Sequence, residues 1–302
     1  MKLRSGKKYK IKPKPPPLKF YNNQNMTGFS DVAIQSVRDY WNRRPCNIRH
    51  STAEIGTKEY FDQVEARKYL VEPHIPAFAE FEKWRGKKVL EIGCGIGTDT
   101  INFARAGALV TAVDLSSESL KLARTRAEVF DLTDRIEFYE VNAEKLSDYV
   151  PSQKYDLVYS FGVVHHSPHP EKIIEQVRKN YAQTGSTLKL MVYYRYSWKV
   201  FWMLLQEKGR FWKLDEIIAK HSEAQTGCPV TYSYTKNTVK NLIGKDFEIK
   251  ENYVEHIFPY RIPEYVKYEY VREWYWRMLP ESVFRKLEKK IGWHLCVTAK
   301  AK

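Results

Sequence analysis

The stretch VLEIGCGIGTDT, residues 89–100, combines residue types that hold a nucleotide or a nucleoside. Its glycines Gly93, Gly95 and Gly97 are spaced G-x-G-x-G, and Glu91 stands two positions before the first of them. Glycine lets a ligand approach the backbone where any Cβ would clash. The third glycine of a G-x-G-x-x-G dinucleotide site and the G-K-[ST] ending of a P-loop are both missing. The spacing therefore predicts a nucleoside-containing cofactor held in another way.

Polar residues follow the next predicted strands at corresponding places. Asp114 ends the second strand, and a carboxylate there can accept both ribose hydroxyls of an adenosine. Asn142 and Ala143 end the third strand, where an amide can hydrogen-bond an adenine edge. The fourth strand leads into the loop GVVHHSPHP. Because ligands of open α/β sheets lie outside the carboxyl ends of the strands, these positions are expected to share one site.

The elements that must position these residues alternate regularly from residue 88 onward. Expected strands are KVLEIG, LVTAVD, IEFYEVN, YDLVYSFGVV and STLKLMVYY, and expected helices are TDTINFARAG, SSESLKLARTRAEVF and PEKIIEQVRKNY. Ser116 or Ser117 is the expected cap of the second helix. Apolar strands that alternate with helices predict a doubly wound α/β fold with a mostly parallel sheet.

The chain divides into four expected parts. Residues 1–28 read as a disordered basic tail, 29–85 as a helical lid segment, 86–195 as the cofactor-binding core and 196–302 as an aromatic-rich acceptor cover with the last strands. Ser30 is a possible cap of the first lid helix, IPAFAEFEKW reads as one helix, and so does the long stretch from WKVFWMLLQ to HSEA. FEIKENYVEH and WHLCVTAK are the expected final strands.

Taken together, these motifs resemble those of class I S-adenosylmethionine-dependent methyltransferases. The matching features are hydrophobic-Glu-x-Gly-x-Gly-x-Gly, the acid of the second strand, Asn-Ala-Glu and G-V-V-H-H-x-P, within roughly residues 85–195. The subgroup most like them includes the ubiquinone and menaquinone biosynthesis type. Where this chain has Asn142, the family usually has Asp, and an amide can still bond adenine.

The resemblance implies S-adenosyl-L-methionine as cofactor and S-adenosyl-L-homocysteine as product. By its motifs, Gly93, Gly95 and Gly97 would line the methionine and ribose, and Glu91 would anchor the turn and the ligand's amino group. It further implies three sets of contacts. Asp114 would bind the ribose, Leu115, Asn142 and Ala143 would contact adenine, and Phe161 and Gly162 would face the methionine end.

Histidines are the candidate bases for a methyl transfer to oxygen. His165 and His166 follow the fourth strand, and His256 belongs to EHIFPYRIPEY. A histidine bonded to a backbone carbonyl is the alternative for at least one of the first two. A metal site from His165, His166 and His169 is a weaker alternative, since two nearby prolines leave no clear ligand geometry, and no metal is expected.

The expected acceptor wall consists of polar residues in aromatic surroundings. Arginines could clamp a carboxylate or phosphate, and the others suit a hydroxylated metabolite, although each taken singly reads more readily as structural. The candidates are Arg43, Arg44, His50, His221, Glu223 and Tyr260.

The composition of the chain limits its expected partners and its expected cellular compartment. The net charge is +14, and eight positive residues precede the first acid, Asp31, so that the tail could contact nucleic acid, an anionic surface or a receptor, or only confer solubility. No apolar run spans a membrane, no secretory signal is visible, and the four cysteines fit a reducing, cytoplasmic compartment.

The sequence thus predicts an S-adenosylmethionine-dependent enzyme that methylates an oxygen of a small polar or hydroxylated acceptor, such as a sugar. The alternatives are an RNA or protein methyltransferase that uses the basic tail, a non-catalytic cofactor-binding protein and, disfavoured by the glycine spacing, a nicotinamide oxidoreductase. The acceptor and the oligomeric state are left open.

Overall fold

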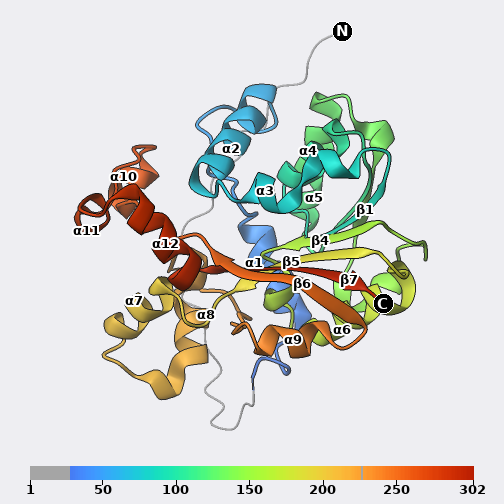
Figure 1. Cartoon of the computed structure of the whole chain (residues 1–302). Coiled ribbons are helices and arrows are strands. Elements are labelled where there is room, and N and C mark those ends of the chain that lie inside the picture. The colour runs from blue at the N-terminus through green and yellow to red at the C-terminus, as the bar shows by residue number, and fades with distance from the viewer. Residues whose placement is uncertain (1–27, 226) are drawn as a thin grey trace.

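A computed structural model describes residues 28–225 and 227–302 of the 302-residue chain, so the expected tail, apart from Gly28, lies outside the described residues. Seven strands form one sheet in the order β3-β2-β1-β4-β5-β7-β6 (Figure 1). β1 to β5 run parallel, and β7 runs antiparallel to β5 and β6. The strands are β1 Lys88–Ile92, β2 Leu109–Asp114, β3 Ile136–Glu140, β4 Leu157–Phe161, β5 Thr187–Tyr193, β6 Phe247–Glu255 and β7 His294–Ala301.

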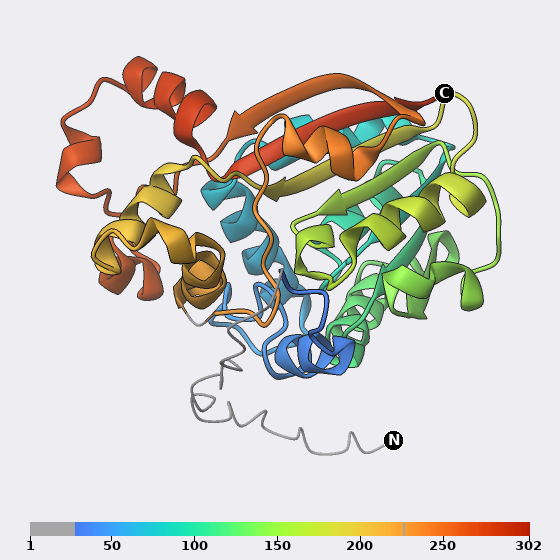
Figure 2. The same ribbon diagram turned by 90° about the horizontal axis from the view of Figure 1, so that it is seen from below.

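Helices cover both faces of this sheet, as the apolar strands require. The bounds are α1 Ile34–Arg43, α2 Lys58–Val71, α3 Ile75–Ala79, α4 Thr98–Arg105, α5 Ser117–Val129, α6 Pro170–Gln176, α7 Trp198–Gln206, α8 Leu214–Gln225, α9 Thr238–Ile243, α10 Ile262–Val266, α11 Trp274–Arg277 and α12 Glu281–Ile291. Side chains of α3, α4, α5, α7 and α8 share one core cluster, and those of α6 and α9 share the other. Figures 1 and 2 show these layers, which confirm the doubly wound α/β prediction.

Of the expected helix ends, one is as predicted and three differ. Ser116 caps α5 by accepting a hydrogen bond from the Ser119 amide, as expected. Ser30 does not cap α1, which begins after Ala33 without a side-chain cap. The expected helix of IPAFAEFEKW breaks at Glu80, whose φ is 52°. The long helix after residue 197 is also two helices, because the chain turns at Gly209, whose φ is 73°.

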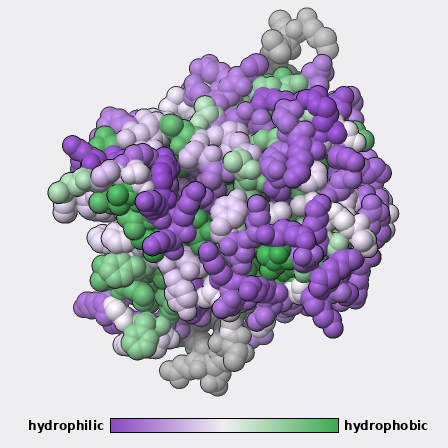
Figure 3. Space-filling model, in the orientation of Figure 1, coloured by the Kyte–Doolittle hydropathy of each residue, from purple (hydrophilic) through white to green (hydrophobic). Residues whose placement is uncertain are grey.

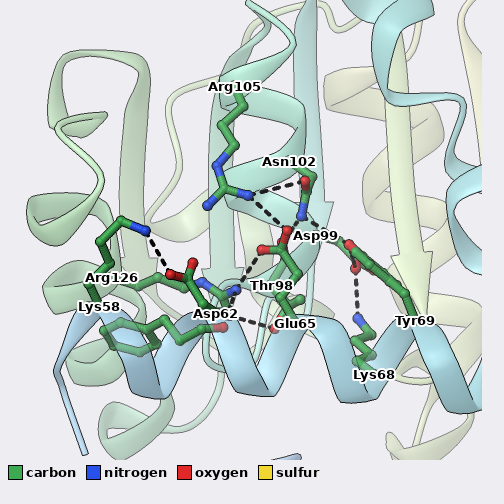
Figure 4. Close-up of polar contacts among 11 residues, drawn as sticks. Lys58, Asp62, Glu65, Lys68, Tyr69, Thr98, Asp99, Asn102, Arg105 and Arg126 are labelled. Atoms are coloured by element: carbon green, nitrogen blue, oxygen red, sulfur yellow. Dashed lines mark hydrogen bonds and ion pairs between the residues drawn. The ribbon is translucent and has the colours of Figure 1, made fainter.

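The N-terminal segment is fastened to the core by buried polar contacts. Figure 4 shows α2 lying across the start of α4, with the side chains between them. The Asp99 carboxylate accepts hydrogen bonds from Lys68 at 2.7 Å, from the Tyr69 hydroxyl at 2.9 Å and from the Tyr159 hydroxyl at 2.9 Å. Because Asp99 is 2% exposed, these donors offset the cost of burying its charge. Helix α2 is therefore tied to both α4 and β4.

Arg126 of α5 is the second fastening point, and it is fully buried. It donates to the hydroxyl of Thr98 at 2.7 Å, to the carbonyl of Phe61 at 3.2 Å and to the carboxylate of Glu65 at 2.8 Å. Helices α2, α4 and α5 thus meet at one guanidinium (Figure 4).

We expect Arg126→Ala to lower the free energy of unfolding by roughly 3 kcal/mol, because it removes three charged hydrogen bonds and leaves a cavity. Urea denaturation measures the change, and Arg135→Ala, at an exposed arginine, is the control. A loss for Arg126→Ala no larger than that of the control would contradict this role.

The C-terminal cover carries much of the exposed apolar surface. Phe211 and Trp212 are 71% and 69% exposed in the turn before α8, and Trp274 of α11 is 67% exposed. Figure 3 shows apolar side chains gathered in the lower left of the view, where Figure 1 places α7 and α8. None of the helices in the described part of the chain is long and apolar enough to cross a membrane.

Candidate active site

The glycine-rich turn after β1 has one glycine that faces open space. A Cβ on Gly93 would lie 2.2 Å from a methyl of Val163, and a Cβ on Gly97 would lie 3.1 Å from Ala123. A Cβ on Gly95 would meet nothing within 4 Å. The first and third glycines therefore serve packing of the chain against itself, and Gly95 alone leaves room for a ligand to approach.

These surroundings predict different effects for two alanine substitutions. Gly93→Ala should lower the free energy of unfolding by about 2–4 kcal/mol, since overpacking adds to the strain of a left-handed backbone. Gly95→Ala carries only the strain, about 1–2 kcal/mol, and should mainly weaken cofactor binding. Thermal unfolding and calorimetric titration of both variants measure the contrast, and equal stability losses would contradict it.

Asp114 stands at the carboxyl end of β2 beside this turn. One carboxylate oxygen accepts from the Gly95 amide at 2.8 Å and the other from the Ser116 amide at 2.8 Å. Each oxygen keeps a further lone pair, so the side chain holds the turn and can still accept ligand hydroxyls. Burial raises the pKa of Asp114, and the backbone amides oppose that rise.

Glu91 points into the core. It is 3% exposed, accepts a hydrogen bond from the Thr100 hydroxyl at 2.5 Å, and has a pKa raised by burial. This position fits the expected anchoring of the turn, because Thr100 belongs to the first turns of α4.

The other expected cofactor residues lie at the same sheet edge. Leu115 follows β2, and its carbonyl accepts from the Arg38 guanidinium of α1 at 3.2 Å. Asn142 accepts from the Glu144 amide at 3.0 Å, so its amide nitrogen is oriented by a local turn, and Ala143 packs on the core beside it. Phe161 ends β4, and Gly162 follows with φ of 77°.

An adenosine carrying a methionine side chain fits this arrangement. The open approach at Gly95, the spare lone pairs of Asp114 and the amide of Asn142 occur in the order in which such a cofactor presents methionine, ribose and adenine. The observation that decides the fit is Gly95, where a Cβ would fill the only one of the three glycine positions that the protein leaves open.

His165 and His166 lie together beside Tyr193 at the end of β5. The ring centres of His165 and Tyr193 are 4.0 Å apart, and His166 Nδ1 is 2.8 Å from the carbonyl oxygen of Val230. Neither ring nitrogen of His165 has a hydrogen-bond partner among the described residues, and both are inaccessible. The bond to Val230 matches the structural alternative for His166, and both imidazoles are packed inside rather than presented to open space.

Glu223 of α8 connects this group. Its carboxylate lies 3.4 Å from His166 Nε2 and accepts a short hydrogen bond from the Tyr193 hydroxyl. Burial opposes both charges, but Cys228 and Glu223 raise the pKa of His166 to about 10, and His166 with Lys199 and Tyr193 lowers the pKa of Glu223 to about 2. The structure therefore holds His166 and Glu223 as an ion pair.

This pair predicts a pH dependence of stability. The contribution of His166, whose pKa rises on folding, is complete below about pH 6.5 and is lost as pH rises through about 10. The contribution of Glu223, whose pKa falls on folding, is complete above about pH 4.5 and is lost as pH falls toward about 2. We expect Glu223→Gln to destabilise more at pH 5.5 than at pH 9 in urea unfolding. A cost that grows with pH would contradict the pair.

A second group of polar side chains lies on the other side of Tyr193. Glu72 follows α2, His256 follows β6, and His294 begins β7 opposite Tyr193 in the sheet. The ring centres of His256 and His294 are 4.6 Å apart, and His294 Nε2 is 3.6 Å from a carboxylate oxygen of Glu72. The ring of His294 also lies 5.5 Å from that of Phe161. This second group therefore adjoins the expected methionine end of the cofactor.

The pKa values of the two histidines in this second group keep them neutral. Burial, with His74 and Lys199 nearby, lowers the pKa of His256 and that of His294 well below the usual range. His256 is 7% exposed and makes no side-chain hydrogen bond with another described residue. Of the three expected catalytic histidines, His256 is thus the one whose ring has neither a hydrogen-bond partner nor fully inaccessible nitrogens.

The expected acceptor residues are only partly brought together. Arg44 donates to the Glu223 carbonyl at 3.2 Å, which places both near the histidines, whereas Arg43 is exposed on α1. His221 lies away from them, and its Nε2 is 2.7 Å from the carboxylate of Glu207, the residue after α7.

His50 and Tyr260 belong to a separate aromatic region around Tyr265. His50 Nε2 lies 3.3 Å from the Tyr265 hydroxyl, and the Tyr260 ring stacks on that of Tyr265 at 6.3 Å. Neither contact reaches the two histidine groups, so the structure gives these two residues, like His221, structural partners instead of a place on a shared wall.

Sequence reasoning missed Glu72 and His294 of the second group, and His74 beside them. Each stands at the end or start of an element, which is a usable signal. Proline follows Glu72 and ends α2, and His294 opens the last expected strand. Their convergence depends on the antiparallel register of β5, β7 and β6, which the sequence does not give.

Comparison with known proteins adds a family to this geometry. Residues 83–246, more than half of the chain, match the family model described as a methyltransferase domain. The chain is similar to the ubiquinone biosynthesis O-methyltransferase of Idiomarina loihiensis, with 32% identity over 136 residues, 45% of this chain and 49% of that protein. It is also similar to the mitochondrial one of Arabidopsis thaliana, with 34% identity over 105 residues, 35% of this chain and 32% of that protein.

These similarities cover only part of each curated relative. The chain spans about half or less of the length of those two curated relatives. A solved structure of magnesium protoporphyrin IX methyltransferase from Synechocystis PCC 6803, with bound S-adenosylhomocysteine, aligns with a TM-score of 0.53 over 88% of this chain and 98% of that one. At 17% identity this likeness shows the fold.

Proposed function

Since the chain belongs to the class I S-adenosylmethionine-dependent methyltransferase family, we propose that it methylates an oxygen of a small, polar, hydroxylated acceptor, such as a sugar or another metabolite. The family assignment comes from the domain match over residues 83–246. The choice of a small oxygen acceptor is supported by the side chains beyond Phe161 and by the O-methyltransferase activity for which the curated relatives are named.

Different residues of the chain would contact different parts of the cofactor. Gly95 leaves room for it, Asp114 would accept the ribose hydroxyls, and Leu115, Asn142 and Ala143 would contact adenine. Phe161 and Gly162 would face the methionine end. Gly93 and Gly97 let the turn pack closely against Val163 and Ala123. Glu91 holds the turn by accepting a hydrogen bond from Thr100.

The cofactor held by Asp114 and Asn142 would supply an activated methyl group to the acceptor oxygen, with the electron pair of the broken bond left on sulfur and the hydroxyl proton passed to a base or to water. The protein must align the acceptor and exclude water, and positioning of this kind lowers barriers by about 7–11 kcal/mol. His256 would lie against the acceptor. The wall between the two histidine groups would be formed by the packed side chains of Tyr193, Glu223, His165 and His166.

One observation carries the choice of acceptor. Neutral imidazoles of His256 and His294 and the carboxylate of Glu72 gather next to Phe161, where both histidines are less than 8% exposed. Groups this enclosed suit a small molecule with hydroxyl donors better than a protein or RNA surface. The basic N-terminal stretch on which the RNA or protein alternative rests lies outside the described residues.

Calorimetric titration with S-adenosylmethionine, S-adenosylhomocysteine and NADH tests the cofactor. We expect the first two to bind and NADH not to bind, and binding of NADH alone would overturn the proposal. An acceptor screen with labelled methyl donor follows, with hydroxylated metabolites in one arm and total RNA and protein in the other. Label transfer confined to the macromolecules would refute a small acceptor, and cofactor binding without any transfer would favour a non-catalytic binding protein.

A further inference from the structure

Glu72, His256 and His294 bring one potential metal-ligand atom each within 4.8 Å of one another. Among the described residues, no other group of three or more histidine, cysteine, aspartate or glutamate side chains meets this geometry. In particular, His165, His166 and His169 do not form such a group, and His169 instead lies 3.4 Å from Glu171.

Three separate segments build this cluster. Glu72 is the residue that ends α2, His256 leaves β6 with a left-handed φ of 70°, and His294 opens β7. Glu255 pairs with His294 in the β6–β7 register, so the two histidines are neighbours across the strands. The contacts that fasten α2 to α4 bring the carboxylate over them.

A second layer orients one of the imidazoles. His74 Nε2 lies 3.0 Å from His294 Nδ1, so one of these nitrogens carries the shared proton. If His294 donates it, the lone pair of His294 Nε2 faces Glu72, whose oxygen is 3.6 Å away. Histidine ligands of metals are commonly held by such a hydrogen bond from the other ring nitrogen.

We propose that Glu72, His256 and His294 bind a divalent transition-metal ion of the Zn²⁺, Fe²⁺ or Mn²⁺ class. Ligand atoms about 2.1 Å from an ion lie about 3.4 Å apart in a tetrahedral site, so the separations of up to 4.8 Å would shorten by as much as roughly 1.4 Å when the ion binds. Two imidazoles and one carboxylate favour these ions over Mg²⁺ or Ca²⁺, which prefer oxygen ligands.

The location gives the ion a role, and this step rests on the proposed methyl transfer. Three protein ligands leave coordination positions open, and the cluster lies against Phe161 at the expected methionine end. An acceptor oxygen in an open position would be oriented by the ion and would lose its proton more easily. The acceptors that fit best are those with two adjacent oxygens, which can chelate, such as a catechol or a hydroxy acid.

Cobalt binding to the full-length protein, freed of metal and of any tag, tests the site directly. We expect one Co²⁺ per chain, with visible absorption bands of a site with nitrogen and oxygen ligands. Glu72→Gln and His294→Ala should each weaken binding at least 10–100-fold, and His74→Gln should weaken it by about 10-fold. His169→Ala, outside the cluster, is the matched control and should leave binding unchanged.

Two outcomes would overturn the metal site: wild-type protein that binds no stoichiometric Co²⁺, or binding that survives both ligand substitutions. Circular dichroism establishes that each variant is folded, and the near-isosteric Glu72→Gln decides the question if His294→Ala unfolds. Titration with S-adenosylmethionine on the same samples separates the two proposals. Co²⁺ binding without cofactor binding refutes the methyltransferase role alone, whereas full methyl transfer by the metal-free protein refutes only the role of the ion in that transfer.

Discussion

Asp114→Ala should weaken S-adenosylmethionine binding by at least about 100-fold and leave the fold intact. Hydrogen bonds to a charged group contribute about 1.5–3 kcal/mol each, and loss of two ribose hydroxyl contacts exceeds the roughly 3 kcal/mol that corresponds to this factor. The carboxylate also accepts from the amides of Gly95 and Ser116, so its removal loosens the turn that the ligand approaches. Both effects act on binding in the same direction.

The matched control for Asp114→Ala is Glu140→Ala, which removes a carboxylate from the carboxyl end of the neighbouring strand β3. Glu140 pairs with Arg38 at 2.9 Å and is half exposed, so its loss changes the local charge without removing a contact to ribose. Calorimetric titration should show its affinity within about threefold of wild type. Equal losses in the two variants would mean that charge, and not hydrogen bonding by Asp114, determines affinity.

The central fold was predictable because its signals are local. Apolar strands, glycine at the turns and Ser116 at the start of α5 each specify their own element, and parallel strands then place their carboxyl ends at one edge. The positions of Asp114, Asn142 and Phe161 at this edge all follow from this rule. The helix break at Glu80 could not be predicted, because glutamate carries no local signal for positive φ.

The acceptor side was harder to predict because it is built by long-range pairing. Tyr193 and His294 stand opposite each other only through the antiparallel pairing of β5 and β7, about a hundred residues apart in the chain. His221 looked equivalent to Glu223 in sequence, since two positions separate them on one helix. The structure points the first toward Glu207 and the second toward Tyr193. Helix α12 was missed although Phe284, Leu287 and Ile291 have helical spacing.

The expected cofactor residues and the cluster of Glu72, His256 and His294 depend on different parts of the fold. The expected cofactor residues lie on turns that directly follow strands of the central sheet, so their positions depend mainly on that sheet. Glu72, His256 and His294 meet only when α2, β6 and β7 are all docked. Loosening of α2, as in Arg126→Ala, should therefore impair turnover more than it impairs cofactor affinity.

His256→Asn should lower kcat about 10²–10⁴-fold while the affinity for S-adenosylmethionine stays within about threefold of wild type, because it removes one of the three proposed ligands of the ion that would polarise the acceptor oxygen. Asparagine suits this position because it tolerates the left-handed backbone of His256, whose φ is 70°. The imidazole makes no side-chain hydrogen bond within the described part of the chain and adjoins His294 beside Phe161, so its loss should remove a contact to the acceptor and leave the cofactor turn unchanged. Single-turnover rates with saturating acceptor measure the effect, with His169→Asn as control. A rise in KM with unchanged kcat would mean that His256 only binds the acceptor, because an interaction used in the transition state must appear in kcat.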